Sequence, residues 1–471
     1  MNYQNKKATI FWYDLETFGL DSHYDRIAQF AGRRTDLDLN PIGEPVVYYC
    51  HLSDDYLPDP LSCLITGITP QEVNQKGICE SDLINRINEE FSVPETTVAG
   101  FNNIRFDDEF IRNALYRNFL DPYKREWENN CSRWDIIDLV RAAYDLRPEG
   151  IQWPARKAET GNPTFKLTAL TEANDIDQTG AHDALVDVNA TIAIARLIKE
   201  KQPRLYSYYY SLRKKAKVKE IVQTPFGEPV LYTASFFSTN TGCSRLIVPL
   251  TPLPDNGNSI LCFDLSKDVA PLLQANAENL MEVDGVFTLA VNKCPFVSKG
   301  AVLTDKLAVK LGIDKKLALL RYDQICNQTN LLLLGREYKD TFEPVQDVDF
   351  LLYDGFFPDS DHKRFELIRK AEPKDKLTMN LAFDDPRSAQ LLFRHVCRNW
   401  VEILDEATLK KWKSFCANRI LNPPGTIKIN WEFYRRKIDE KLASTDTSPE
   451  EKLVLAKLKS YGTELEKRIF G

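Results

Sequence analysis

The stretch TIFWYDLETFGL, residues 9–20, decides how the first part of the chain folds. Its apolar, aromatic and β-branched run from Ile10 to Tyr13 predicts a buried strand, and the carboxylates of Asp14 and Glu16 follow at once. Side chains two residues apart on a strand point to the same face of the sheet. Because hard divalent cations prefer carboxylate oxygens, the pair predicts either half of a metal site or a solvated strand end.

Length and composition indicate a globular protein with more than one domain. A chain of 471 residues suits two or three domains, and 43% hydrophobic with 27% charged residues is enough for a normal core. Ten cysteines occur singly, without a Cys-x-x-Cys pair, which argues against a zinc ribbon or a disulfide framework and predicts reduced, mostly buried thiols. The net charge of −7 does not exclude a nucleic-acid partner, because bound cations offset catalytic carboxylates and a basic run occupies residues 212–219.

The sequence predicts no membrane segment. No apolar run approaches the roughly 20 residues that cross a bilayer. The N-terminal MNYQNKKATI is not followed by the apolar segment and small-residue cleavage site of a signal peptide, so we expect a cytoplasmic protein.

Hydrophobic patterns divide the chain into three regions. The first alternates strands and helices around one mixed sheet, with strands expected at 8–14, 25–35, 45–52 and 96–102 and helices at 80–91, 106–119, 135–145 and 181–200. A tyrosine-rich, basic segment at 199–219 looks like a boundary. Short strands with turn-rich connections and a helical insertion near 304–321 follow. From about 358 the pattern is helical, with helices expected at 362–371, 386–400, 407–421 and 448–468. We expect domains at 1–200, 201–350 and 351–471.

Two more groups of polar residues in the first region extend the possible metal site. The segment AGFNNIRFDDEF (99–110) predicts a short strand and then a helix that opens near Asp107. A favourable helix dipole explains acids at a helix start but does not require the Asn-x-x-Phe-Asp arrangement. In TGAHDALVDVNATIAIARLI (179–198), His182 and Asp187 lie among apolar neighbours, where a metal explains an aspartate better than solvent does.

The three groups occur in the order Asp-x-Glu, helical Asp, and His-x-x-x-x-Asp. This order resembles that of the histidine-bearing branch of the DEDD exonucleases, which have the ribonuclease-H-like fold. The similarity is greatest to the bacterial exodeoxyribonuclease I family and spans nearly the whole chain. It rests on DLETFG, LITGITPQE, GFNNIRFDDEF, SRWDIIDLVRA and AHDALVDVNATIA, and later on QPRLY, NKCP and YDGFF. Two departures are Leu15, where this family often has Tyr, and Lys166, where Arg is usual; a lysine keeps the charge but loses the bidentate fork.

This resemblance implies an α/β fold: a ribonuclease-H-like exonuclease domain with a mixed sheet, a small Src-homology-like β-barrel, and an α-helical C-terminal domain. The three regions of the sequence agree with it. It further implies 3′→5′ degradation of single-stranded DNA to 5′-mononucleotides in DNA repair and recombination. The expected partners are single-stranded DNA and the C-terminal tail of the single-stranded-DNA-binding protein, with no membrane contact, and the expected state is a monomer.

For the chemistry, we expect Asp14, Glu16, Asp107 and Asp187 to hold two Mg²⁺ or Mn²⁺ ions. Two cations about 4 Å apart can activate a water, neutralise the phosphoryl oxygens and stabilise the leaving alkoxide. His182 is expected to be the general base, because the unperturbed pKa of histidine, about 6.5, lies near working pH.

Contacts to the DNA strand are expected from basic side chains along the phosphates and aromatic side chains stacked on the bases. The family positions expected to face DNA are Arg112, Tyr123, Trp127 and Arg141, with Lys166 near the scissile phosphate. Glu16 of the metal cage and Lys215 of the basic run complete the expected contact residues. The aromatics could equally belong to the core, and the cations to solvated faces or ion pairs.

Three other functions fit parts of the pattern. An RNA exonuclease could use the same metal site, because contact with the 2′-hydroxyl, which separates RNA from DNA, leaves no trace in these motifs. A non-catalytic single-strand-binding repair protein could keep the fold, but the loss of a carboxylate or of the base would mark it, and all five residues are present. The size of the second and third regions disfavours an unrelated magnesium phosphatase.

Overall fold

The structure is a computed structural model that describes residues 7–157, 159–180, 182–237, 240–328, 330–338 and 346–471. In these ranges no helix has the length and apolar character needed to cross a membrane. The ten cysteines are all free thiols and eight of them are buried, which confirms the prediction from their scattered positions.

A five-stranded sheet organises the first region, in the order β3–β2–β1–β4–β5. Its central strand β1 pairs antiparallel with β2 and parallel with β4, so the predicted mixed sheet is confirmed. β5 was not predicted; it is short and lies where a helix was expected to begin. The strands are β1 (Thr9–Thr17), β2 (Ile27–Thr35), β3 (Pro41–Tyr49), β4 (Thr96–Gly100) and β5 (Ser132–Asp135).

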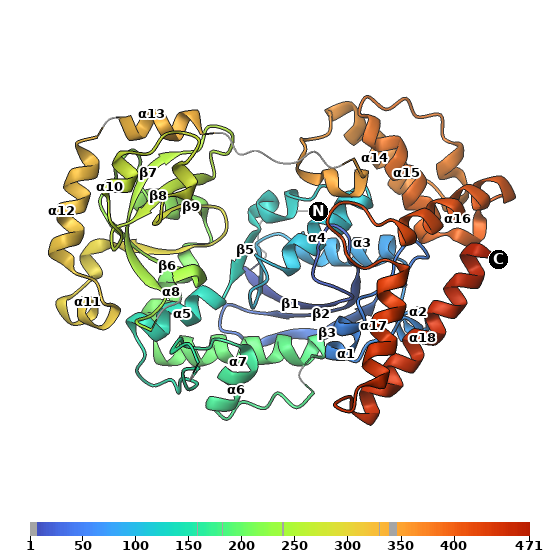
Figure 1. Ribbon diagram of the computed structural model, residues 1–471, viewed down its shortest axis with the longest axis horizontal. Coiled ribbons are helices and arrows are strands. Elements are labelled where there is room, and N and C mark those ends of the chain that lie inside the picture. Colours follow the sequence, from blue (N-terminus) through green and yellow to red (C-terminus); the bar gives the residue numbers. More distant parts are fainter. Residues whose placement is uncertain (1–6, 158, 181, 238–239, 329, 339–345) are drawn as a thin grey trace.

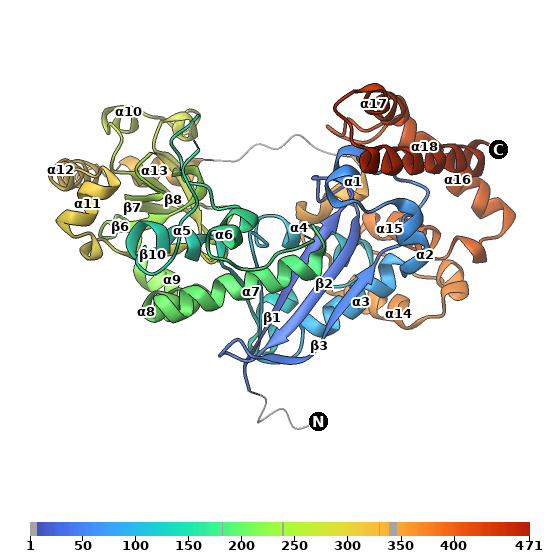
Figure 2. The same cartoon turned by 90° about the horizontal axis from the view of Figure 1, so that it is seen from below.

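Helices cover both faces of this sheet. They are α1 (Pro60–Thr66), α2 (Pro70–Lys76), α3 (Glu80–Phe91), α4 (Asp107–Arg117), α5 (Ile137–Leu146), α6 (Leu167–Ala173) and α7 (Ala184–Lys201). The strand period of two sends Phe11, Tyr13 and Leu15 into one core with α3 and α4, whereas Trp12 packs on the opposite side, in the core that includes α7. Asp14 and Glu16 therefore share the α7 side of the sheet, along which α7 runs in Figure 2.

The helix predicted at 181–200 begins later than expected, at Ala184. Asp183 occupies the N-cap with extended backbone, and its Oδ1 accepts a hydrogen bond from the N–H of Leu185 at 3.0 Å. His182 precedes the cap in a left-handed conformation, at a φ of 70°. The prediction that His182 and Asp187 share one helix is thus wrong for the histidine, and residue 181 lies outside the described residues.

The second region contains a five-stranded antiparallel sheet in the order β10–β6–β7–β8–β9, drawn to the left in Figure 1. Its strands are β6 (Val230–Thr233), β7 (Ser244–Pro252), β8 (Ser259–Asp264), β9 (Val286–Ala290) and β10 (Phe296–Lys299). Its helices are α10 (Ala270–Leu273), α11 (Asp305–Leu311), α12 (Lys315–Cys326) and α13 (Asn330–Glu337). The helical insertion near 304–321 is confirmed as α11 and the first half of α12.

The boundary segment at 199–219 is largely helical rather than an extended linker. After the end of α7 it forms α8 (Pro203–Ser211) and the start of α9 (Lys215–Ile221). Tyr206 and Tyr209 are buried and pack on Trp134 of β5, so the tyrosine cluster ties the second region to the first sheet.

The third region is helical, as predicted, and lies to the right of the first sheet in Figure 1. It opens with a short 3₁₀ segment at Val348–Tyr353 and continues with α14 (Asp359–Lys370), α15 (Pro386–Asn399), α16 (Glu406–Leu421), α17 (Trp431–Ala443) and α18 (Pro449–Phe470). The sequence analysis missed α17. The exact domain borders at residues 200 and 350 stay a prediction.

A buried ion cluster joins the third region to the first domain. Asp55 Oδ2 accepts hydrogen bonds from Arg398 at 2.8 and 3.0 Å, and Asp349 accepts from Arg398 and, at 2.9 Å, from Arg419. Burial alone would raise the pKa of Asp55, but the neighbouring arginines hold it well below its usual range. These charges are compensated across the interface, so removing one leaves an excess of the opposite charge buried among the remaining pairs.

Candidate active site

Two carboxylates of the site come from the last residues of β1. Asp14 and Glu16 alternate with Tyr13 and Leu15, which are buried on the other face of the sheet. Glu16 is 8% exposed, and a β-bulge against β2 follows it. The sheet thus delivers both carboxylates to the α7 side, as the strand period predicts.

Asp107 reaches the same strand from the start of α4. Its Oδ1 accepts a hydrogen bond from the backbone N–H of Leu15 at 3.1 Å. The paired register of β1 with β4 ends at Trp12, so the Asp107 carboxylate supplies a partner to β1 where β4 no longer does. This bond fixes Asp107 between the two carboxylates of β1.

The loop before α7 and its first turn complete the site. Glu16, His182 and Asp187 each offer a ligand atom, and these atoms lie within 4.8 Å of one another. Gln178 donates a hydrogen bond from Nε2 to Asp187 Oδ1 at 2.6 Å and so orients that carboxylate. His182 is exposed at the surface of the site. The histidine and aspartate therefore meet the Glu16 carboxylate of β1 although His182 lies outside the helix, and Asp14 and Asp107 are not part of this group of ligand atoms.

The electrostatics show that the four acids form one group. Burial raises the pKa of Glu16 to about 8, and Asp187 and Asp107 add to the shift. Burial likewise raises the pKa of Asp14 well above its usual value, with further contributions from Asp107, Glu16 and Asp187. The pKa values of Asp107 and Asp187 are also raised, first by burial. Such mutual repulsion is what a bound cation relieves.

The donor set fits hard divalent cations. All four acids offer carboxylate oxygens, the ligands that Mg²⁺ and Mn²⁺ prefer, and His182 adds a nitrogen at the rim. No cysteine belongs to the group of ligand atoms found among the described residues. The arrangement is therefore suited to holding cations against a phosphate ester and to placing a proton acceptor beside them.

Among the residues predicted to contact DNA, the two arginines form buried ion pairs, whereas other side chains are exposed. The Arg112 guanidinium is only 5% exposed and bonds Glu109 at 2.9 Å and Glu126 at 2.7 Å. Arg141 is similarly buried and pairs with Asp138 at 2.6 Å. Trp127 is 64% exposed, and Lys166 and Lys215 are also exposed. A direct phosphate contact is thus easier for the two lysines than for the two arginines, and all these roles stay predictions.

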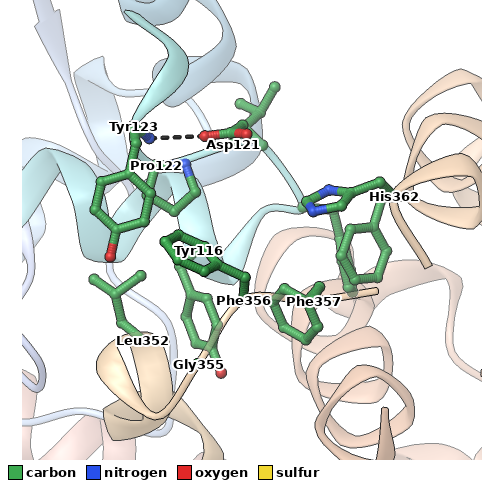
Figure 3. Close-up of a pocket in the computed structure, with 12 residues that line it drawn as sticks. Tyr116, Asp121, Pro122, Tyr123, Leu352, Gly355, Phe356, Phe357 and His362 are labelled. Atoms are coloured by element: carbon green, nitrogen blue, oxygen red, sulfur yellow. Dashed lines mark hydrogen bonds between the residues drawn. The ribbon is translucent and has the colours of Figure 1, made fainter. Parts of the chain in front are cut away.

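Tyr123 lies in a small pocket where the first and third regions meet. The pocket, of about 40 Å³, is drawn in Figure 3, where Tyr116, Pro122 and Tyr123 face Leu352 and Phe356. Phe356 is 85% exposed, and its ring meets that of Tyr123 edge-on at 5.8 Å. Tyr123 is therefore partly buried where the first and third regions meet. This position is intermediate between the two alternatives that the sequence left open, an exposed ring that stacks on bases and a core residue.

The sequence analysis missed three side chains that shape the site. Gln178 orients Asp187, and Gln29 of β2 accepts a hydrogen bond from the N–H of Ala184 at 3.1 Å, which fixes the start of α7. Tyr353, from the third region, donates to Glu109 and accepts from Arg112 at 3.4 Å. Isolated glutamines and a tyrosine more than 200 residues from Asp107 carry no periodic signal, so only the fold reveals them.

Comparison with known proteins places the chain in a family. Three family models match it in order: an exonuclease model at residues 11–195, an exonuclease I SH3-like domain at 213–344 and an exonuclease I C-terminal domain at 346–465. Exodeoxyribonuclease I of Escherichia coli is 39% identical over 430 residues, which cover 88% of this chain and 90% of that protein. The chain belongs to the exonuclease I family.

Solved structures of exonuclease I agree over the whole length. The enzyme of Methylocaldum szegediense matches with a TM-score of 0.92 and 40% identity, covering 97% of this chain and 99% of its own. The Escherichia coli enzyme in complex with a dA16 oligonucleotide matches with a TM-score of 0.92 and 36% identity, covering 98% and 100%. The predicted fold class of three parts, exonuclease domain, SH3-like domain and helical C-terminal domain, is confirmed.

Further structures of this family carry ligands. One is a zinc-bound form of the Escherichia coli enzyme with single-stranded DNA, and another is a complex of exonuclease I with SSB-Ct. Oligoribonuclease of Shewanella baltica, by contrast, matches over only 26% of this chain. The exonuclease fold itself implies that the chain depends on a divalent metal.

Proposed function

We propose that this chain is a 3′→5′ exonuclease that degrades single-stranded DNA to 5′-mononucleotides in DNA repair and recombination. The observation that carries the proposal is the convergence of Glu16, His182 and Asp187 within 4.8 Å, beside Asp14 and Asp107. Membership of the exonuclease I family over most of the chain supports DNA as the substrate. An RNA-directed enzyme and a non-catalytic binding protein are not favoured.

We assign the carboxylates of Asp14, Glu16, Asp107 and Asp187 to a cage for two Mg²⁺ ions, with Mn²⁺ as the alternative. When bound, the cations supply an activated water and neutralise charge on the phosphoryl oxygens. The proposal for these ligands is supported by the raised pKa of each carboxyl group, which burial causes first and neighbouring carboxylates increase further.

We assign the general base to His182. A neutral imidazole nitrogen at the rim of the cage accepts the proton of the attacking water and releases it to solvent, because His182 is exposed. The left-handed backbone at this residue turns the chain so that its side chain reaches the acids, although α7 begins two residues later. Gln178 keeps the Asp187 carboxylate in its orientation toward the same point.

We assign the hold on the DNA strand to the exposed side chains among the expected contact residues and to the half-buried ring of Tyr123. Trp127 and Tyr123 stack on bases, and Lys166 and Lys215 contact phosphates. Glu16 contacts the terminal nucleotide from within the cage. Arg112 and Arg141 share their charge with carboxylates, so we assign them to neutralising the strand's phosphates at longer range.

We also propose that the enzyme binds the C-terminal tail of the single-stranded-DNA-binding protein, acts as a monomer and works in the cytoplasm. A family structure with SSB-Ct supports the partner.

The test is digestion of end-labelled single-stranded DNA, RNA and duplex DNA, with Mg²⁺ and with EDTA. We expect mononucleotides from the 3′ end of single-stranded DNA alone, and no product in EDTA. Restoration of activity should follow Mg²⁺ or Mn²⁺ addition, because both are hard cations that suit the carboxylate cage. Digestion of RNA at an equal rate, or activity that persists in EDTA, would contradict the proposal.

Replacing His182 by alanine should lower turnover by roughly 10² or more, as expected for a lost general base. Mn²⁺ binding, measured by titration calorimetry, should persist because the four carboxylates remain. The matched control is His51→Ala, an exposed histidine outside the site, which should keep the full rate. A near wild-type rate for the His182 variant would remove it from the mechanism.

A further inference from the structure

Four aromatic rings gather on the second domain, and we call them the aromatic cluster: Tyr232, Phe236, Phe237 and Phe287. The ring centroid of Phe236 lies 4.3 Å from that of Phe237, 5.1 Å from that of Phe287 and 6.1 Å from that of Tyr232. Tyr232 and Phe287 stack at 5.9 Å with an interplanar angle of 17°. Phe236 is thus supported by rings on three sides.

One ring of the cluster, that of Phe236, is exposed, and the other rings pack against it. Tyr232 and Phe237 are 5% and 7% exposed, whereas Phe236 is 57% exposed. A single exposed phenylalanine on a flexible segment is ordinary and needs no explanation. Here the exposed ring is held by packed neighbours, so it pays little conformational entropy when a flat partner stacks on it.

The cluster lies beside the exonuclease domain. Tyr232 and Phe237 belong to the same hydrophobic core as Trp134, Ile136 and Val140, which come from β5, the residue after it and α5. The exposed ring of Phe236 therefore lies where the second domain meets the domain that carries the carboxylate cage.

Two guanidinium groups adjoin the cluster at this junction. Arg105 and Arg141 both bond Asp138, at 3.0 and 2.6 Å, and buried Asp135 lies near the same charges, so two carboxylates balance the two arginines. Arg105 is the more exposed of the two arginines, at 37% against 10%. Burial raises the pKa of Tyr232, and the charges of Asp138, Arg105 and Arg141 act on it as well, which places them near its ring. Arg105 precedes Asp107 of the cage by two residues, so the segment that carries Arg105 leads to the start of α4 at the active site.

We propose that the aromatic cluster, with Phe236 outermost, is a stacking platform for bases of the single strand upstream of the scissile nucleotide. Arg105 and Arg141 neutralise the phosphates of the same segment. The combination of an aromatic face with adjacent cations is the chemistry by which proteins hold single strands without reading their sequence. The platform extends the strand path from the cage onto the second domain, and the inference rests on the proposed function.

A protein segment is the rival occupant of such an apolar face. The strand is favoured because the exposed ring lies at the junction with the domain that carries the cage, and because the Arg105 guanidinium, 37% exposed, lies near the cluster where a phosphate can reach it. A protein docked here would leave the digestion of naked DNA independent of Phe236, and this outcome would overturn the proposal.

The test compares a strand long enough to reach the cluster with one too short to do so. Phe236→Ala should raise the KM for a strand of about 20 nucleotides by roughly tenfold, the effect of losing one base–aromatic stack, and leave its kcat nearly unchanged. The KM for a trinucleotide, which occupies only the cage, should not change. If the KM for the long strand stays at the wild-type value, the platform does not exist.

Two further variants separate stacking from a structural role. Phe470→Ala, in α18 of the third domain, removes a comparably exposed ring (48%) and should leave both KM values unchanged. Phe236→Trp should restore the KM for the long strand, and its added fluorescence should be quenched by the long strand and not by the trinucleotide. Failure of the unsubstituted chain to digest either DNA would sink the proposed function itself, a result distinct from failure of the platform.

Discussion

Replacing Asp14 by asparagine should lower the rate of single-strand hydrolysis by at least about 10⁴-fold, because it removes a cage carboxylate and several kcal/mol of charge stabilisation in the transition state. The side chain keeps its shape, so the fold should remain. Without metal the variant should melt no lower than the unsubstituted chain, since the raised pKa of Asp14 shows that burial and the neighbouring acids disfavour its charge. Rates of mononucleotide release and melting temperatures in EDTA measure both effects.

The melting temperature also reports the metal. Saturating Mn²⁺ should raise it for the unsubstituted chain through preferential binding to the folded state, and much less for Asp14→Asn. The matched control is Asp183→Asn at the N-cap of α7, which lies close to the cage but bonds Leu185 instead. Asparagine caps a helix as well as aspartate does, so this variant should lose less than about tenfold in rate. Equal losses in the two variants would mean that general charge, and not ligation, governs the rate.

Replacing Asp349 by alanine should lower the free energy of unfolding by about 3–5 kcal/mol, because it removes a carboxylate shared by three buried arginines and leaves excess positive charge in the cluster. The Asp349 carboxylate is fully buried and lies within ion-pair distance of Arg394, Arg398 and Arg419. Denaturant unfolding of the full chain measures the loss. Since the cluster joins the third region to Asp55 of the first, limited proteolysis should also cut the variant faster at this junction.

An exposed ion pair in the same region provides the control. Asp384 bonds Arg364 at 3.0 Å, and its side chain is 56% exposed. Asp384→Ala should change the free energy of unfolding by less than about 1 kcal/mol, because solvent screens such pairs. If Asp349→Ala were equally mild, water or rearranged arginines would have to compensate the missing charge, and the cluster would not hold the regions together.

Local patterns predicted the elements and the acids of the site well. The strand containing Asp14 and Glu16 and the helix at 80–91 appear where their periodicity placed them. β5, with only four residues, and α17 escaped because short or weakly patterned segments give no distinct period. The early start predicted for α7 failed because the cap at Asp183, not the apolar pattern, sets where the helix begins.

Pairwise contacts between distant segments were out of reach. Arg112 was a candidate for a phosphate contact or for an ion pair, and the fold brings Glu109 and Glu126 against it and Tyr353 alongside. The tyrosines of the predicted linker turned out to be core residues against Trp134. In each case the partner lies on another element, so composition and spacing could not reveal it.

The sequence by itself brought out five candidate side chains, because each belongs to a local pattern (a strand pair, a helix start, and a loop before a helix) and the patterns together resemble a known family. Tertiary structure decided how they meet. The Leu15 N–H bonds the Asp107 carboxylate and so holds it at β1, and Gln178 orients Asp187 by a hydrogen bond. His182 itself has a left-handed backbone, and its exposed side chain lies beside Glu16 and Asp187. It also decided which cations are free and which rings are exposed, since burial and pairing depend on neighbours that only the folded chain provides.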